Sequence, residues 1–118
     1  MCGICGEFRF DNAKISDIRS NMMLNAITPR GPDNTGQFKD KNIFLGHTRL
    51  SVIDISPNSN QPMEDNGLII IFNGVIFNYK ELKKNLIDEG YSFISEGDTE
   101  VLLKSFMHYG EDMMDHLD

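Results

Sequence analysis

The apolar and polar positions in the first third of the chain predict a strand, a helix and a loop, in that order. Residues 2–10 place apolar side chains among glycines, which is typical of a strand with a close backbone neighbour. Over residues 14–27 the apolar side chains follow a loose helical period, with Asp11 or Asn12 as the expected N-cap. The two prolines and two glycines of residues 28–36 then predict a loop.

Longer apolar runs in the middle of the chain predict further strands. Residues 42–55 (NIFLGHTRLSVIDI) are typical of a strand, which Gly46 is expected to interrupt. The polar residues 56–67 predict a long loop, and loops of this length often carry function. The continuous apolar run in residues 68–74 (LIIIFNG) predicts a strand that is buried on both faces.

The last third of the chain predicts two helices around a short strand. Residues 78–90 (NYKELKKNLIDEG) have the period of an amphipathic helix that ends at a glycine. Residues 91–94 (YSFI) predict a short strand, and a second helix is expected from Asp98 to the residue before Gly110. This order of elements predicts an α+β fold in which helices cover one face of a mainly antiparallel sheet.

Length and charge narrow the class of protein. The 118 residues suffice for one ordinary domain, and no internal repeat or linker divides them. Eleven basic and eighteen acidic residues give a net charge of −7, which argues against nucleic acid or an anionic membrane as a partner. No apolar run approaches the roughly 20 residues of a membrane helix, and no signal peptide is recognisable, so we expect a cytoplasmic protein.

The two cysteines, Cys2 and Cys5, offer the first candidate chemistry. Their CxxC spacing fits a redox pair, but the residues that follow indicate a strand rather than the helix usual for that motif. No second CxxC and no spaced histidine pair accompanies them, so no metal site is expected. Removal of Met1 would also make Cys2 the N-terminal residue, which would then carry both a thiol and a free α-amine.

Six stretches together resemble a known family. MCGICGEF, RGPDNTG, GHTRLSVIDIS, NQPM, FNGVIFNY and SEGDTEVLL occur in the order found in the glutamine amidotransferase domain of the asparagine synthetase family, the class II or N-terminal-nucleophile type. The resemblance implies an αββα sandwich of two stacked antiparallel sheets with helices outside. It also implies that residues 1–118 are the N-terminal part of such a domain, an expectation that fits the abrupt end in EDMMDHLD.

The resemblance assigns catalysis to Cys2, Asn73 and Gly74. A thiol titrates near about 8.5 and an α-amine near about 7.7–8.0, so the amine can act as base for its own thiol once Met1 is removed. Asn73 and Gly74 would stabilise the tetrahedral oxyanion with a side-chain amide and a backbone N–H. The pattern alone favours a different interpretation, because Asn-Gly between apolar runs is the commonest signal for a hairpin turn.

The resemblance assigns the amino-acid end of the substrate to Arg49, Asp98 and the backbone near Ile53. Arg49 suits the α-carboxylate, and Asp98 suits the α-ammonium, although Asp98 also stands where a helix N-cap belongs. Asparagine synthetases typically have a glutamate directly after the Asn-Gly pair, where this chain has Val75. We therefore expect a working site with weakened affinity for glutamine.

Other conspicuous residues are interpreted as structural. Arg30, Gly31 and Asp33 match a family motif and are assigned to loop architecture. Cys5 is expected to pack in the core. His47 is also interpreted as structural, because the family mechanism does not use a Cys/His pair at this position.

The function implied is hydrolysis of glutamine to supply ammonia for amidation of aspartate or another carboxylate. The partners implied are L-glutamine and a synthetase domain; a homodimer is possible. No cofactor is expected within residues 1–118, since ATP and Mg²⁺ belong to the synthetase domain, and these residues alone are expected to be weakly active or inactive. Three alternatives stay open: a non-catalytic remnant with an interaction or regulatory role, an amidotransferase of surface-polysaccharide sugar biosynthesis, and a CxxC redox module.

Overall fold

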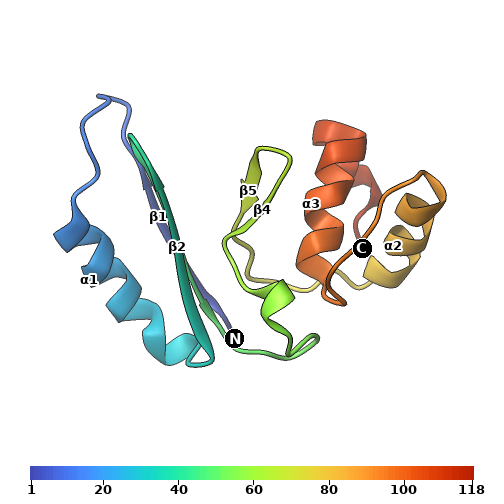
Figure 1. Ribbon diagram of the computed structural model, residues 1–118, viewed down its shortest axis with the longest axis horizontal. Helices are drawn as coiled ribbons and strands as arrows, with labels where there is room; N and C mark the ends of the chain where they lie inside the picture. Colours follow the sequence, from blue (N-terminus) through green and yellow to red (C-terminus); the bar gives the residue numbers. More distant parts are fainter.

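Two antiparallel sheets lie side by side in the computed structural model, which describes residues 1–118 (Figure 1). The larger sheet has the strand order β1-β3-β2, and the smaller one is the hairpin β4-β5. The strands are β1 (Gly3–Phe8), β2 (Asn34–Asp40), β3 (Ile43–Arg49), β4 (Met63–Asp65) and β5 (Leu68–Ile70).

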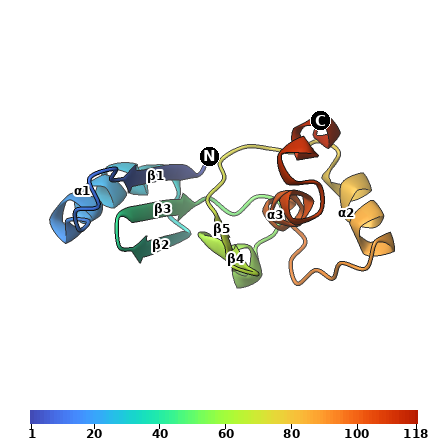
Figure 2. The same ribbon diagram turned by 90° about the horizontal axis from the view of Figure 1, so that it is seen from above.

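Helices cover the outer sides of both sheets. Helix α1 (Asp17–Ile27) packs on β1 and β3, whereas α3 (Asp98–Tyr109) packs against the hairpin and α2 (Tyr79–Asp88) packs on α3. Seen from above, the order is therefore helix, sheet, hairpin, helix, which confirms the predicted α+β fold (Figure 2). Three 3₁₀ segments complete the chain: Thr28–Arg30, Pro57–Ser59 and Gly110–His116.

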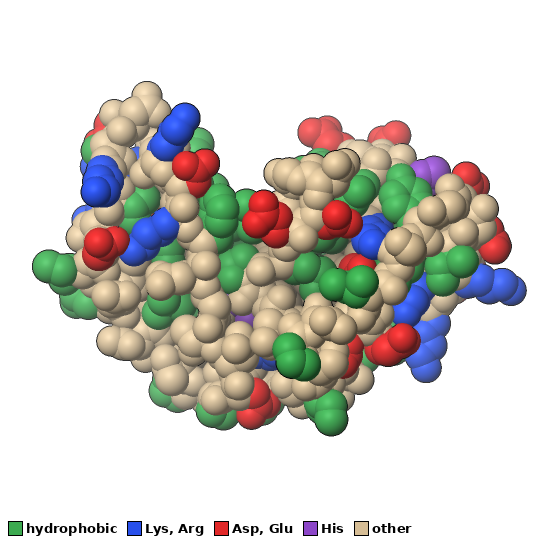
Figure 3. All heavy atoms as spheres, in the orientation of Figure 1, with side chains coloured by type: hydrophobic (Ala, Val, Ile, Leu, Met, Phe, Trp, Pro, Cys, Tyr) green, Lys and Arg blue, Asp and Glu red, His purple; other side chains and the backbone are tan.

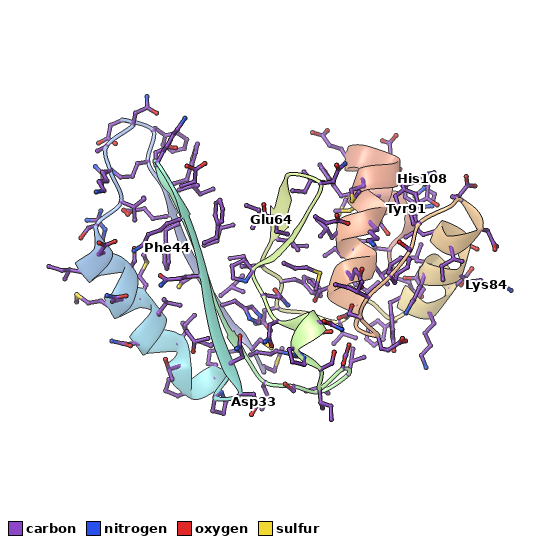
Figure 4. The ribbon with its side chains drawn as sticks, in the orientation of Figure 1. Asp33, Phe44, Glu64, Lys84, Tyr91 and His108 are labelled. Atoms are coloured by element: carbon purple, nitrogen blue, oxygen red, sulfur yellow. The ribbon has the colours of Figure 1, made fainter.

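Two apolar clusters form the core. Phe44 is fully buried and packs with Ile15 and Leu24 between α1 and the larger sheet (Figure 4). The second cluster joins α2 to α3 and consists of Ile76, Leu82, Leu86, Val101 and Leu102. Between the sheets, at the end away from the N-terminus, the surface is hollowed and shows apolar side chains (Figure 3).

Close approach of the backbone explains two glycines of the larger sheet. Gly46 pairs with Cys5, and a Cβ at Gly46 would lie 2.7 Å from both the Cys5 Sγ and the Leu24 Cδ2. Strand β3 therefore runs through Gly46 without interruption, contrary to the prediction. A Cβ at Gly36 would collide with the carbonyl oxygen of Gln61, so this glycine lets the loop before β4 approach β2.

The predicted helices of the last third are confirmed. Helix α2 is followed by Gly90 at a φ of 102°, and α3 is followed by Gly110 at a φ of 62°. These left-handed conformations suit glycine because it has no Cβ.

Several other predictions are wrong. Helix α1 begins at Asp17 with Ser16 as its N-cap, so neither Asp11 nor Asn12 caps it. Strand β2, within and beyond the predicted loop 28–36, was not predicted, and residues 91–94 form no strand.

The apolar run 68–74 differs most from its prediction. Only Leu68–Ile70 are in a strand, which pairs with β4 alone, and the run is half-buried rather than buried on both faces. The prediction failed because apolar composition was taken to mean a central strand, whereas β5 is the second strand of a two-stranded hairpin. No helix of the structure has the length and apolar character that crossing a membrane requires.

Candidate active site

A pocket of about 300 Å³ opens where the N-terminus, the end of β3, the segment after β5 and the start of α3 meet. These segments are far apart in the sequence, and the folding of both sheets brings them together. The pocket is lined by all six residues that the resemblance assigned to the site: Cys2, Arg49, Ile53, Asn73, Gly74 and Asp98.

The thiol of Cys2 is fixed by the backbone that follows β3. Its Sγ lies 3.3 Å from the Leu50 amide nitrogen and 3.6 Å from the Leu50 carbonyl oxygen. The neighbouring Gly3 pairs with Thr48, and a Cβ there would lie 2.8 Å from the Thr48 Oγ1. Glycine at position 3 therefore lets β1 lie close enough to β3 to bring Cys2 beside Leu50.

The RGPD segment supports the backbone around the thiol. Arg30 donates from Nε to the Cys2 carbonyl oxygen at 3.1 Å, and Asp33 accepts from the Ser51 N–H at 2.7 Å. A Cβ at Gly31 would collide with the Thr48 backbone. Asp33 lies at the same end of the sheet as the N-terminus (Figure 4). The contacts agree with the interpretation of this motif as loop architecture.

Neither Cys5 nor His47 lines the pocket that contains the Cys2 thiol. Both cysteines are free, and Cys5 packs against the cluster around Phe44, where burial raises the pKa of its thiol. His47 is fully buried on β3, and burial lowers the pKa of its imidazole, so the ring is neutral. No hydrogen bond joins the His47 ring to Cys2.

Asn73 and Gly74 supply unused hydrogen-bond donors to the pocket. Neither residue has a positive φ, so they do not form the type I′ turn that the Asn-Gly pattern favours. The hairpin turn lies instead at Asn66 and Gly67, whose φ values are 51° and 79°, between β4 and β5. The Gly74 N–H makes no backbone hydrogen bond, and the Asn73 amide has no partner in the chain. Both groups are thus free to donate to a ligand.

Arg49 places a nearly buried cation in the wall of the pocket. Its Nη1 donates to the Ser56 carbonyl oxygen and to the Asn60 Oδ1, both at 2.7 Å, and its exposed fraction is 6%. These two neutral acceptors orient the guanidinium, but no carboxylate of the chain neutralises it. A guanidinium in this state can pair with the carboxylate of a ligand.

Asp98 places a nearly buried carboxylate in the same pocket. Its Oδ2 accepts from the Ile76 N–H at 3.0 Å, and its exposed fraction is 7%. Asp98 is the first residue of α3, while Gly97 is the N-cap, so the N-cap alternative for Asp98 is wrong. No lysine or arginine of the chain pairs with Asp98, and its carboxylate suits a cationic group of a ligand.

Two further residues of the wall matter for the site. Val75 is 56% exposed at the pocket and offers no polar group. Asp54, which the sequence interpretation missed, accepts hydrogen bonds from Ser56, Ser59 and Glu96. The signal that could have found it is a lone carboxylate inside an apolar run, VIDI, next to a long polar loop.

Comparisons with known proteins match this chain to a family. A family model described as "Glutamine amidotransferase domain" matches residues 1–118. "Asparagine synthetase [glutamine-hydrolyzing] 1" of Bacillus subtilis is 43% identical over 95% of the chain and 18% of its own length. "Asparagine synthetase [glutamine-hydrolyzing] 1" of Arabidopsis thaliana is 33% identical over the whole chain and 20% of its own length. "Amidase chry2" of Gibberella zeae is 39% identical over 80% of the chain and 14% of its own length. The chain therefore spans at most about a fifth of these relatives.

Proposed function

Since this chain belongs to the glutamine amidotransferase domain family, we propose that its pocket binds L-glutamine and that Cys2 hydrolyses the side-chain amide. One observation carries the proposal. The same pocket contains a nearly buried cation, a nearly buried carboxylate, a thiol and two unused N–H donors. That set complements glutamine, whose α-carboxylate and α-ammonium are charged and whose amide becomes an oxyanion during attack.

The reacting end of the substrate lies at the thiol. The Cys2 Sγ attacks the amide carbon, and the oxyanion accepts from the Asn73 side chain and the Gly74 N–H. The tetrahedral intermediate collapses with protonation of the leaving nitrogen, which releases ammonia and leaves a γ-glutamyl thioester on Cys2. Water then attacks the thioester carbon, and glutamate leaves with the thiol regenerated.

The α-amine of Cys2 acts as the base for its own thiol. This role requires removal of Met1, since an amide nitrogen has no basic lone pair for the proton. The contacts from Leu50 and Arg30 hold the Cys2 backbone and thiol without using the α-nitrogen. The amine is therefore left for proton transfer.

The amino-acid end of the substrate is held by charge. The Arg49 guanidinium pairs with the α-carboxylate, and the Asp98 carboxylate pairs with the α-ammonium. Backbone groups near Ile53, whose side chain lines the pocket and is 42% exposed, complete this end.

The ammonia serves a second reaction in the complete protein. The relatives matched over 95% of the chain and over the whole chain are named as glutamine-hydrolysing asparagine synthetases, which favours aspartate as the acceptor. In this proposal a synthetase domain binds ATP and Mg²⁺, activates the acceptor and receives ammonia from the pocket.

The experiment compares protein with and without Met1, as verified by N-terminal mass, in an assay of glutamate release from glutamine. We expect activity only in the Met1-free form. Cys2→Ala should abolish it, and Cys5→Ala, the matched thiol control, should largely spare it. Equal rates with and without Met1 would refute the role of the amine. A Met1-free, full-length protein that is inactive at every glutamine concentration would instead be a non-catalytic member of the family.

A further inference from the structure

Asp54 connects two parts of the pocket that are far apart in the sequence. Its Oδ1 accepts from the Ser56 N–H at 2.8 Å, on the loop that follows β3. Its Oδ2 accepts from the Ser59 Oγ at 2.8 Å and from the Glu96 N–H at 2.8 Å, just before α3. The hydrogen bonds from Glu96, Ser56 and Ser59 hold the pKa of the Asp54 carboxyl well below its usual range, so it stays ionised.

Asp54 holds one support of Arg49 and the backbone that leads into Asp98. On one side, the carbonyl oxygen of Ser56 accepts from Arg49, so fixing Ser56 fixes the guanidinium. On the other side, Glu96 is two residues before Asp98, with only Gly97 between them. No lysine or arginine pairs with the Asp54 carboxylate, and its charge is met by these three donors.

We propose that Asp54 is a positioning residue that sets the spacing between Arg49 and Asp98, and thereby the fit of the α-amino acid end of the substrate. The inference rests on the proposed function, because the two charged groups are useful as a pair only to a zwitterionic ligand. Asp54 needs no contact with the substrate for this role, and it should act on binding rather than on the reaction at Cys2.

Asp54→Asn is the sharpest perturbation. Asparagine has the shape of aspartate, but its amide nitrogen donates and cannot accept from an N–H group. One of the two attachments is therefore lost, either the one to Ser56 or the one to Ser59 and Glu96. We expect the KM for glutamine to rise about 10- to 100-fold, the range that loss of a hydrogen bond to a charged group produces. The kcat should change less than about threefold, since the interaction acts on ground state and transition state alike.

The experiment measures three quantities in the full-length, Met1-free protein. These are the KM and kcat for glutamine, and the rate of Cys2 alkylation by iodoacetamide, followed by mass spectrometry. Iodoacetamide has no amino-acid end, so its rate should stay within about twofold in Asp54→Asn. Asp11→Asn is the matched control, because Asp11 also accepts from a backbone N–H and an arginine but lies outside the pocket. It should leave all three quantities unchanged.

Ser59→Ala tests the same carboxylate without altering it. The substitution removes one of the three donors to Asp54, so we expect a smaller rise in the KM for glutamine. If Asp54→Asn does not fold, this rise tests the positioning role in its place. An unchanged KM in the folded variant, or equal losses in KM, kcat and alkylation rate, would overturn the positioning role while wild-type hydrolysis stands. Absence of hydrolysis in the wild-type protein would overturn the proposed function itself, and this inference with it.

Discussion

Replacing Val75 by glutamate should strengthen the binding of glutamine. Val75 lines the pocket with 56% of its surface exposed, and it directly precedes Ile76, whose N–H binds the Asp98 Oδ2 at 3.0 Å. A glutamate at position 75 would therefore be the neighbour of Ile76, which holds Asp98, on the side of the pocket proposed for the α-ammonium of glutamine. The variant tests whether a second carboxylate, beside that of Asp98, strengthens the binding of the α-ammonium of glutamine.

The magnitude follows from the exposure of the site. A charge-assisted hydrogen bond contributes roughly 1.5–3 kcal/mol, and solvent at a half-exposed position reduces an ion pair toward the low end. About 1.4 kcal/mol corresponds to a tenfold change in affinity, so the KM should fall about tenfold. The kcat should hardly change, because the α-ammonium is remote from the amide that reacts.

Initial rates of glutamate release over a range of glutamine concentrations measure both constants. Val75→Gln is the matched control, since it has the shape of the glutamate variant without its charge, and its KM should stay within about twofold of wild type. Raised salt should shrink the gain of Val75→Glu, because the interaction is partly exposed. An unchanged KM for Val75→Glu, or an equal fall for Val75→Gln, would refute the argument from charge.

Three further predictions concern the reaction and the fold. Asn73→Ala removes one proposed oxyanion donor, so steady-state assays should show kcat about 10²–10³-fold lower and KM little changed; an unchanged kcat would contradict that role. Leu86 is fully buried between α2 and α3, so Leu86→Ala should lower the free energy of unfolding by about 2–5 kcal/mol in urea denaturation. Burial alone would raise the pKa of Glu100, but hydrogen bonds from Ser95 and Ile94 hold it below its usual range. Ionised Glu100 therefore stabilises the folded protein at pH values above the ordinary carboxylate pKa, and this stabilisation should be lost on acidification below about pH 4. Glu100→Gln should flatten that dependence of the free energy of unfolding on pH.

The elements predicted best are those whose signal is local. Helices α2 and α3 each combine an apolar stripe with a glycine just past the last turn, and both the stripe and the glycine act within the helix itself. Local chemistry therefore sufficed for the two helices. Strand β1 (Gly3–Phe8) was also predicted, and its glycines are needed for the close approach to β3.

The elements predicted poorly depend on partners that the sequence does not identify. Strand β2 has one aromatic residue among polar ones and lies at a sheet edge, where it needs few apolar side chains. Gly46 weakens the strand pattern locally, yet the Cys5 and Leu24 side chains fill the space that it leaves. Tertiary packing thus overrode the local signal in both cases.

The candidate site shows the same division. The six predicted site residues, all of which line the pocket, were predicted because they occur in motifs shared with a family. Composition and periodicity favoured instead a hairpin at Asn73 and an N-cap at Asp98. Asp54 was missed because its partners are about 40 residues further along the chain as well as next to it. The lone carboxylate in VIDI could have drawn attention to the residue, but its contact with Glu96 cannot be read from a single sequence.

The supports of the pocket divide its residues into two groups with different kinetic signatures. The Cys2 thiol is held by the Leu50 backbone, whereas the Asn73 amide makes no hydrogen bond within the chain, and both belong to the end proposed for the reacting amide. The Ser56 carbonyl oxygen orients Arg49, and the Ile76 N–H orients Asp98. Asp54 joins the loop of Ser56 to the backbone just before Asp98. Substitutions in the first group should therefore lower kcat, and substitutions in the second group or its supports should raise KM.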